Sequence, residues 1–160
     1  MKKIAFLSLA LGMFVSVNAL ASDGKVYNSA SCVSVLGSAT IDRGNIFNNS
    51  RNDLLQVKCL GINDHSAHGI KSAWVEVKDL SATQDVSCTL HSRYNKIGTT
   101  GMGSWADTKK TSGINSDWQR LDYGSMSSRD NSHYYFRCDL PTKTDNGKSW
   151  LGAYKITEND

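Results

Sequence analysis

Three segments of the chain alternate between apolar and polar residues with a period of two. They read SAWVEVKD (72–79), DVSCTLHS (85–92) and SHYYFRCDLP (132–141). This period, together with many β-branched and aromatic residues, indicates strands that bury one face and expose the other. The residues on the predicted apolar faces are Ala73, Val75, Val77, Val86, Cys88, Leu90, Tyr134, Phe136, Cys138 and Leu140.

Shorter runs of strand-like sequence are separated by residues typical of turns, namely Gly, Asn, Asp and Ser. These runs cover 31–36, 45–48, 54–60, 118–123 and 150–157. No amphipathic stretch of helix length follows the first part of the chain. The pattern therefore predicts an all-β fold, an antiparallel β-sandwich of about eight strands, in one domain over residues 22–160.

The first segment of the chain, 1–21, has the features of a secretory signal peptide. Two lysines precede an uncharged apolar run that is too short to span a bilayer, and small residues follow it. We expect cleavage after Ala21 and a mature domain that begins at Ser22. The style of this leader is bacterial. No later apolar run is long enough for a membrane span, so we expect a periplasmic or secreted protein.

All four cysteines lie after this leader, and an even number of cysteines in an exported chain indicates disulfides. Their wide spacing lacks the Cys-x-x-Cys motif of zinc and thioredoxin-like sites. Three pairings are possible in principle. Cys88 and Cys138 both fall on apolar strand faces, which favours a bridge between them in the core. That choice leaves Cys59, which shares a face with Leu55 and Val57, to pair with Cys32.

Residues 93–116 interrupt this strand pattern. The segment is rich in Gly, Ser and Thr and has no sustained period, which predicts a long loop that is either functional or disordered. Trp105 lies in its middle, with Lys109 and Lys110 close behind. Because loops on a rigid scaffold often carry recognition, these three residues are candidate ligand-binding residues, together with Tyr135 on a polar strand face.

Several short motifs run through most of residues 22–160: GNIFNNS (44–50), VKC (57–59), VEVKD (75–79), VSCTL (86–90), YYFRCDLP (134–141) and SWLGAYKITE (149–158). On these motifs the chain resembles a group of small exported bacterial proteins, disulfide-bonded β-sandwiches of unknown function. The resemblance implies export, disulfides and a sandwich, and it brings no catalytic residues. One departure is Leu60, where the group often has proline.

The stretch NDHSAHGI (63–70) raises the question of a metal site or a hydrolase. His65 and His68 lie three apart beside Asp64, and two imidazoles with a carboxylate can bind a transition metal. Glycines bracket the pair, however, and strands are expected on both sides, so a polar loop is the preferred interpretation. No Gly-x-Ser-x-Gly motif occurs, and no thiolate remains once the cysteines are bridged. We therefore predict no enzyme activity and no cofactor.

The charge balance argues against nucleic acid as a partner. The chain has 18 Lys and Arg residues against 15 Asp and Glu, and no basic run stands out. The first interpretation is an exported, non-catalytic binding or envelope-associated protein whose partner is a protein or glycan in the envelope or outside the cell. The alternative is a module that binds carbohydrate or a small ligand. A second alternative is a metal-binding protein or hydrolase that uses His65 and His68.

Overall fold

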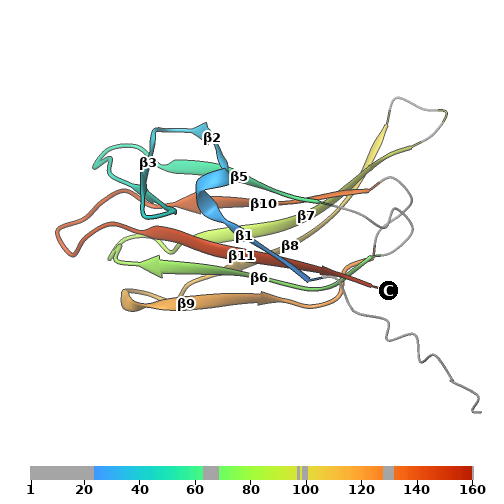
Figure 1. Ribbon diagram of the computed structural model, residues 1–160. Helices are drawn as coiled ribbons and strands as arrows, with labels where there is room; N and C mark the ends of the chain where they lie inside the picture. The colour runs from blue at the N-terminus through green and yellow to red at the C-terminus, as the bar shows by residue number, and fades with distance from the viewer. Residues whose placement is uncertain (1–23, 63–68, 97, 99–100, 128–131, 160) are drawn as a thin grey trace, which may run out of the picture.

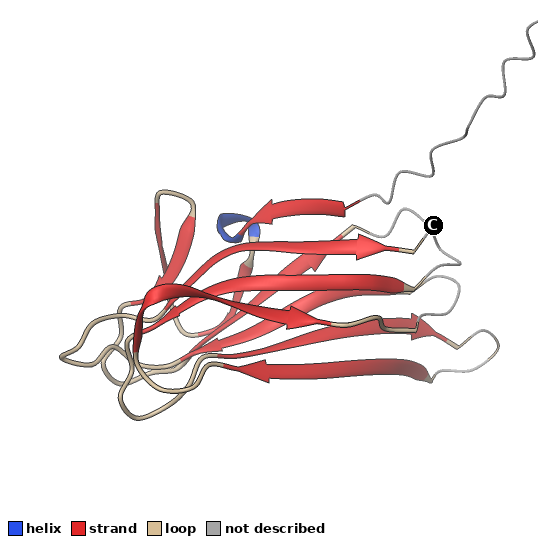
Figure 2. Ribbon diagram, turned by 90° about the horizontal axis from the view of Figure 1, so that it is seen from below, coloured by secondary structure: helices blue, strands red, loops and turns tan. Residues whose placement is uncertain are grey.

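The computed structural model describes residues 24–62, 69–96, 98, 101–127 and 132–159, and these form an antiparallel β-sandwich (Figure 1). Two sheets of antiparallel strands pack face to face, as the sequence predicts. Figure 2 shows the molecule from below, with one short 3-10 helix, η1 (Ser29–Ser31), following directly on the first strand. No helix in these described ranges is long and apolar enough to cross a membrane.

Sheet A has the strand order β3-β4-β11-β6-β9, and β1 pairs with the remainder of the β11 edge. Its strands are β1 (Gly24–Asn28), β3 (Ala39–Asp42), β4 (Asn45–Asn48), β6 (Ile70–Asp79), β9 (Asn115–Tyr123) and β11 (Trp150–Glu158). Sheet B has the order β2-β5-β10-β7-β8. Its strands are β2 (Val33–Leu36), β5 (Leu55–Gly61), β7 (Ser87–Asn95), β8 (Met102–Lys110) and β10 (His133–Leu140).

The core lies between the two sheets and contains the apolar faces that the alternation predicts. Each of the ten predicted inward residues is at most 2% exposed. Sheet A adds apolar side chains from β4, β9 and β11, and sheet B adds those of β5. The largest fully buried side chains are Tyr134, Tyr154, Phe136, Ile46, Leu55, Ile70, Leu90, Leu140 and Leu151. The period of two is therefore imposed by burial of one face of each sheet.

The described residues contain eleven strands, so the expected count of about eight is wrong. The three strands that the sequence did not reveal are β1, β3 and β8. All three lie at sheet margins, where one side of the strand remains open to solvent and alternation is weak. The expected long loop over 93–116 is wrong for the same reason, because β7 continues to Asn95, β8 covers Met102–Lys110 and β9 begins at Asn115.

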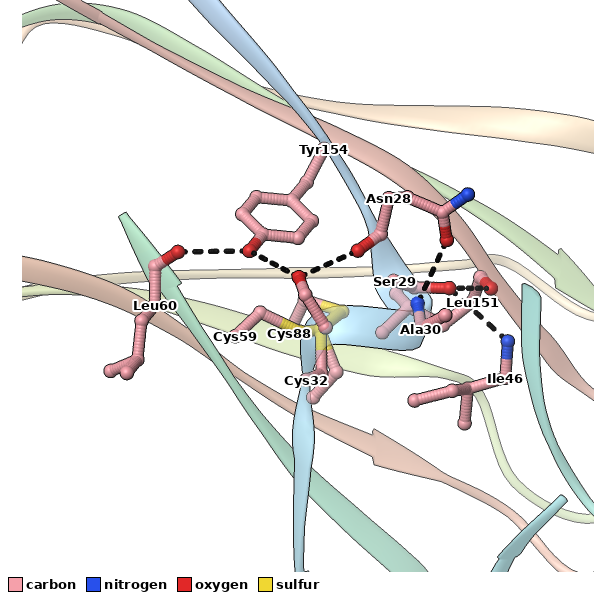
Figure 3. The surroundings of a disulfide bond; sticks show 12 residues. Asn28, Ser29, Ala30, Cys32, Ile46, Cys59, Leu60, Cys88, Leu151 and Tyr154 are labelled. Carbon is pink, nitrogen blue, oxygen red and sulfur yellow. Dashed lines mark hydrogen bonds between the residues drawn. A yellow bond between two sulfur atoms is a disulfide. The ribbon is translucent and has the colours of Figure 1, made fainter. Parts of the chain in front are cut away.

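Two disulfides join strands of sheet B, and they connect the same cysteines that the alternation favours. Cys88 and Cys138 are direct partners in the β7–β10 register and are fully buried. Cys32 precedes β2 and bonds to Cys59 on β5. Figure 3 shows the surroundings of the second bridge, where the Tyr154 hydroxyl donates a 2.8 Å hydrogen bond to the Leu60 carbonyl, next to Cys59. This hydrogen bond joins β11 of sheet A to β5 of sheet B beside the bridge.

The tight turn between β10 and β11 does not form the hairpin that its sequence indicates. The sequence Asn146-Gly147 indicates a hairpin, and a turn does form, with Thr144 and Gly147 exchanging backbone hydrogen bonds. Gly147 has a φ of 132°, which explains the glycine. However, β10 belongs to sheet B and β11 to sheet A, so this turn carries the chain from one sheet to the other.

Candidate ligand-binding surfaces

Three tryptophans share the outer face of sheet A, and we call Trp74, Trp118 and Trp150 the aromatic face. Trp74 alternates with the buried Ala73 and Val75, and Trp150 precedes the buried Leu151. Their positions follow directly from the period of two, because the residue next to an inward side chain must point outward. Strands β9, β6 and β11 are neighbours, so the aromatic face is continuous across three strands.

Trp118 lies across the sheet and does not project from it. A Cβ built on Gly152 of β11 would lie 2.9 Å from Cζ3 and 3.3 Å from Cη2 of the Trp118 indole. Since Trp118 belongs to β9 and β6 lies between these strands, the indole extends over β6 to reach β11. It remains 47% exposed. The far edge of the ring therefore lies over Gly152, and the indole extends along the outer face of the sheet while staying half-exposed.

The other two tryptophans are held by neighbouring side chains. The Arg120 guanidinium lies 5.0 Å from the Trp74 ring centroid, a cation–π contact. Trp150 packs against Phe47 with ring centroids 4.4 Å apart. Polar groups surround the rings on the same face, and they come from the paired positions Glu76–Arg120, Trp74–Asp122, Trp74–Lys155 and Trp150–Lys78. The aromatic face thus combines a flat apolar ring with donors and acceptors of hydrogen bonds.

The outer face of sheet B has a different character, because cations gather there around Tyr135. We call Lys58, His91, Arg93, His133 and Arg137 the cationic cluster. The Lys58 ammonium lies 4.1 Å and the Arg93 guanidinium 5.7 Å from the Tyr135 ring centroid. His91 stacks on Tyr135 with centroids 4.6 Å apart, and His133 stacks more loosely at 6.2 Å. Tyr135 is therefore covered and only 6% exposed.

The cationic cluster also places like charges directly opposite each other. In the sheet register Lys58 pairs with Arg137, and Arg93 pairs with the imidazole of His133, which adds a positive charge only when it is protonated. Like charges in such positions destabilise a sheet. The ion pairs between described residues involve Arg51, Lys109 and Arg120, and none of them involves Lys58, Arg93 or Arg137. The nearest acid of the same face, Asp139, accepts a 2.7 Å hydrogen bond from Gln56.

This environment changes the titration of both histidines. Burial, followed by repulsion from Arg137, Arg93 and Lys58, holds the pKa of His91 below its usual value of 6.5. Burial, followed by Lys58 and Arg93, lowers the pKa of His133 in the same way. Both imidazoles are consequently disposed to stay neutral unless a negative charge approaches them.

The structure does not bring the four candidate ligand-binding residues together. Trp105 and Lys109 lie on the side of β8 that faces the sandwich interior, because they pair with the inward Ser92 and Cys88 of β7. Lys110 pairs with Ser87 and lies on the outer face, as does Tyr135. Trp105 is 49% exposed, because β8 forms the edge of its sheet. Tyr135, in contrast, offers almost no free ring surface.

The candidate metal ligands His65 and His68 lie outside the described residues. Within the part of the chain that the structure describes, no group of three or more His, Cys, Asp or Glu side chains could hold a metal ion. His91 and His133, the other histidines considered, lie on the outer face of sheet B among cations.

Comparison with known proteins identifies the fold. No family model and no curated protein matches the chain. A family two carbohydrate esterase from Cellvibrio japonicus aligns over 86% of this chain and 34% of its own, with 7% identity and a TM-score of 0.51. The xylan binding module CBM86 from Roseburia intestinalis aligns over 86% and 96%, with 14% identity and a TM-score of 0.49.

A GH26-CBM35 β-(1,4)-mannanase from Podospora anserina aligns over 86% of this chain and 28% of its own, with 9% identity and a TM-score of 0.46. The chain therefore spans about a third of the length of the esterase and of the mannanase. At these identities the likeness concerns the fold, a β-sandwich that recurs in proteins with different functions.

The sequence contained part of the signal for the aromatic face and little for the cationic cluster. Trp118 and Trp150 each begin a predicted strand, and alternation from the apolar Leu151 already places Trp150 outward. The cationic cluster was not predicted. Its members come from β5, β7 and β10, and only the register between those strands shows that they meet.

Proposed function

We propose that this protein is a non-catalytic carbohydrate-binding domain that holds sugar rings against the aromatic face of sheet A. The observation that carries the proposal is the position of Trp118, whose half-exposed indole reaches across β6 to Gly152 and so lies along the outer face of sheet A. Sugar rings have an apolar C–H face that stacks on such a surface, and their hydroxyl groups need polar partners at its margin.

The residues around Trp118 supply such partners. Glu76 and Asp122 offer carboxylate oxygens as acceptors, and Lys78 and Arg120 offer donors, all on the outer face of sheet A. The indole of Trp118 reaches from β9 to Gly152 on β11, two residues from Trp150, so the two tryptophans cover a width of three strands, about 10 Å at a spacing of about 4.8 Å and enough for more than one sugar ring. An extended neutral glycan is therefore the ligand that this surface suits best.

The proposal favours the carbohydrate-binding alternative over an unspecified protein partner. A protein interface normally has a well-packed apolar centre, whereas Trp118 is surrounded by charged side chains. We also propose that the domain acts outside the cytoplasm, in the periplasm or after secretion. Two buried disulfides support this location, because disulfides persist mainly in oxidising compartments.

A second candidate position is the β8 edge around Trp105. Its indole is as exposed as that of Trp118, and Lys109 pairs with Asp107 at 3.5 Å beside it on the same face of the strand. Trp105 lies on the edge strand of sheet B, whereas Trp118 shares the outer face of sheet A with Trp74 and Trp150. For that reason we place the primary site at Trp118 and treat Trp105 as the comparison.

The test is a pair of alanine variants assayed for binding to a panel of neutral polysaccharides that includes xylan, mannan, galactan and cellulose. Affinity gel electrophoresis identifies the polysaccharides bound, and titration calorimetry with oligosaccharides measures the dissociation constant. Trp118→Ala should weaken binding at least tenfold, Trp118→Phe should retain part of it, and Trp105→Ala should leave it nearly unchanged. Thermal denaturation shows whether each variant is folded.

Two outcomes contradict the proposal. Loss of binding in Trp105→Ala with normal binding in Trp118→Ala would move the site to the β8 edge. Failure of the folded wild-type protein to bind any neutral polysaccharide in the panel would remove the aromatic face as a site for neutral glycans.

A further inference from the structure

We propose that the cationic cluster on the outer face of sheet B is a second binding site, which takes the carboxylate or sulfate groups of an acidic polysaccharide. The inference does not rest on the aromatic face. The two surfaces are the outer faces of opposite sheets, so one can bind its ligand while the other fails.

The first argument is the uncompensated charge. Lys58 faces Arg137 across the strand pair β5–β10, and His133 faces Arg93 across β10–β7. The like-charge pair Lys58–Arg137 on one side and the cation Arg93 on the other thus border the central pair Tyr135–His91. An arrangement that costs stability and makes no ion pair among the described residues is expected where an external anion supplies the missing charge.

The second argument is the geometry of the donors. The Lys58 and Arg93 cations both lie within 6 Å of the centroid of the Tyr135 ring. Arg137 is next to Thr89 in the register, and the Thr89 hydroxyl lies 2.9 Å from that of Thr108. Ammonium, guanidinium and hydroxyl groups therefore occupy three adjacent strands on one flat surface, which suits several oxyanions along an extended, hydroxylated chain.

The third argument concerns other classes of partner. Tyr135 is covered by its neighbours and is 6% exposed, so the cluster offers no free aromatic ring on which a base could stack. Leu60, which pairs with Tyr135 across β5–β10, is 56% exposed, but a single aliphatic side chain is a small apolar centre for a protein partner. The formal net charge of the whole chain is only +3, which is small for a protein that binds a nucleic acid backbone.

The test measures binding of polygalacturonate, which carries carboxylates, and of dextran sulfate, which carries sulfates, with neutral dextran for comparison. We expect one or both acidic polymers to bind in 50 mM salt, and the preferred polymer identifies the group that the site takes. Binding should weaken steeply as salt is added. Single-stranded DNA and poly-L-glutamate should bind at least tenfold more weakly.

Variants assign the binding to this face. The double variant Lys58→Gln/Arg137→Gln should weaken binding at least tenfold, and removing a like-charge pair should leave the thermal midpoint equal or higher. The matched control is Arg51→Gln/Lys71→Gln, which removes the same charge from two exposed positions outside both surfaces. That control should change affinity less than twofold, and Trp118→Ala should not change it.

A spectroscopic readout follows the site directly. The charged groups around the histidines are Lys58 from β5, Arg93 from β7 and Arg137 from β10, while Asp139 lies farther along β10 opposite Ser87 and β8 contributes the uncharged Ala106 and Thr108. A bound anion should oppose the cations and raise the pKa of His91 and His133. Proton NMR of the two imidazoles with and without polymer should show this upward shift, and binding should be tighter at pH 5.5 than at pH 7.5.

Three results would overturn the inference. Equal losses in the Lys58/Arg137 variant and in the Arg51/Lys71 control would show a general effect of net charge. Tighter binding of single-stranded DNA or poly-L-glutamate than of either polysaccharide would show a partner of another class. No binding of either acidic polymer by the folded protein in low salt would exclude the site as proposed.

Discussion

The indole ring of Trp118 and the backbone of Gly152 are in contact across strand β6, with Cζ3 of the ring 2.9 Å from the point where a Cβ on Gly152 would lie. Any larger residue at 152 would meet the ring edge and also the Cβ of Glu76, at 3.4 Å. The absence of a side chain at this position is therefore what lets the tryptophan extend across the outer face of sheet A to β11.

This contact predicts that Gly152→Ala will weaken glycan binding without unfolding the protein. The added methyl group must displace the Trp118 ring, which can swing toward solvent because it is half-exposed. We expect a several-fold loss of affinity in titration calorimetry, a change in tryptophan fluorescence, and a thermal midpoint within a few degrees of wild type. Gly124→Ala is the control, because a Cβ there meets nothing within 4 Å. Unchanged affinity in Gly152→Ala would show that the contact between Gly152 and the Trp118 ring does not support glycan binding.

A second prediction concerns Asp79, a fully buried carboxylate at the end of β6. One of its oxygens accepts hydrogen bonds from the Ser81 amide at 2.9 Å and the Ser149 hydroxyl at 3.0 Å. The other accepts from the Val86 amide at 2.9 Å and from the Thr111 hydroxyl. The carboxylate therefore holds together the segments before β7, β9 and β11.

Asp79→Asn should lower the free energy of unfolding by about 2–4 kcal/mol, because the amide nitrogen would face donors and leave buried groups unpaired. Urea denaturation measures the change. Asp85→Asn provides the control: its carboxylate accepts from the Gly113 amide at an exposed site and should lose less than about 1 kcal/mol. A loss below 1 kcal/mol in Asp79→Asn would mean that the network rearranges around the amide.

The elements that the sequence predicted depend on a local pattern, whereas the features that it missed depend on contacts between distant segments. Alternation identified the buried faces of β6, β7 and β10 because burial of one face constrains every second residue of a central strand. It failed for β8, where Trp105 pairs with the inward Ser92 and yet remains half-exposed at the sheet edge. Where solvent reaches an inward position of an edge strand, that position need not be apolar. The sequence of such a strand has no clear period of two and resembles the sequence of a loop.

The candidate sites show the same limit. Trp118 becomes a platform only because Gly152, on a strand that is not its neighbour, lacks a side chain. Tyr135 lies on the polar face that alternation assigns to it, but the stacking of His91 and the approach of Lys58 depend on strand register. Register is fixed by packing between distant segments, and the local pattern of a single sequence does not predict it.

A third prediction links stability to pH through His91. The pKa of His91 is lowered in the folded protein by burial and by Arg137, Arg93 and Lys58, and the unfolded chain should titrate near 6.5. Below that pH the unfolded state binds a proton that the folded state resists, so stability falls as pH decreases. The thermal midpoint should drop between pH 7.5 and pH 5.5, and the drop should be smaller in His91→Gln.

The matched variant for this pH effect is His133→Gln. The imidazole of His133 is more exposed than that of His91 and should contribute less to the pH dependence of stability. An equal decrease in wild type and in the double variant His91→Gln/His133→Gln would assign the pH dependence to carboxylates. Addition of a bound polyanion should reduce the decrease in wild type, because the anion stabilises the protonated imidazoles.

The last prediction ranks the two disulfides. The Cys88–Cys138 bridge spans 50 residues of sequence and the Cys32–Cys59 bridge spans 27. Constraint of the unfolded chain then gives about 4 kcal/mol for the first bridge and about 3.5 kcal/mol for the second. The first bridge also fills the core between β7 and β10, because both of its cysteines are fully buried, whereas Cys32 is 9% exposed. Its removal should therefore leave the larger defect.

Paired alanine variants test the ranking by urea denaturation under identical conditions. Cys32→Ala/Cys59→Ala should remain folded with a lower midpoint, and Cys88→Ala/Cys138→Ala should show the lower midpoint of the two. Glycan binding at Trp118 should persist in the first variant, since that bridge joins strands of sheet B while Trp118 and Gly152 belong to sheet A. A larger loss from removing Cys32–Cys59 would show that anchoring the segment between η1 and β2 to β5 matters more than the central bridge.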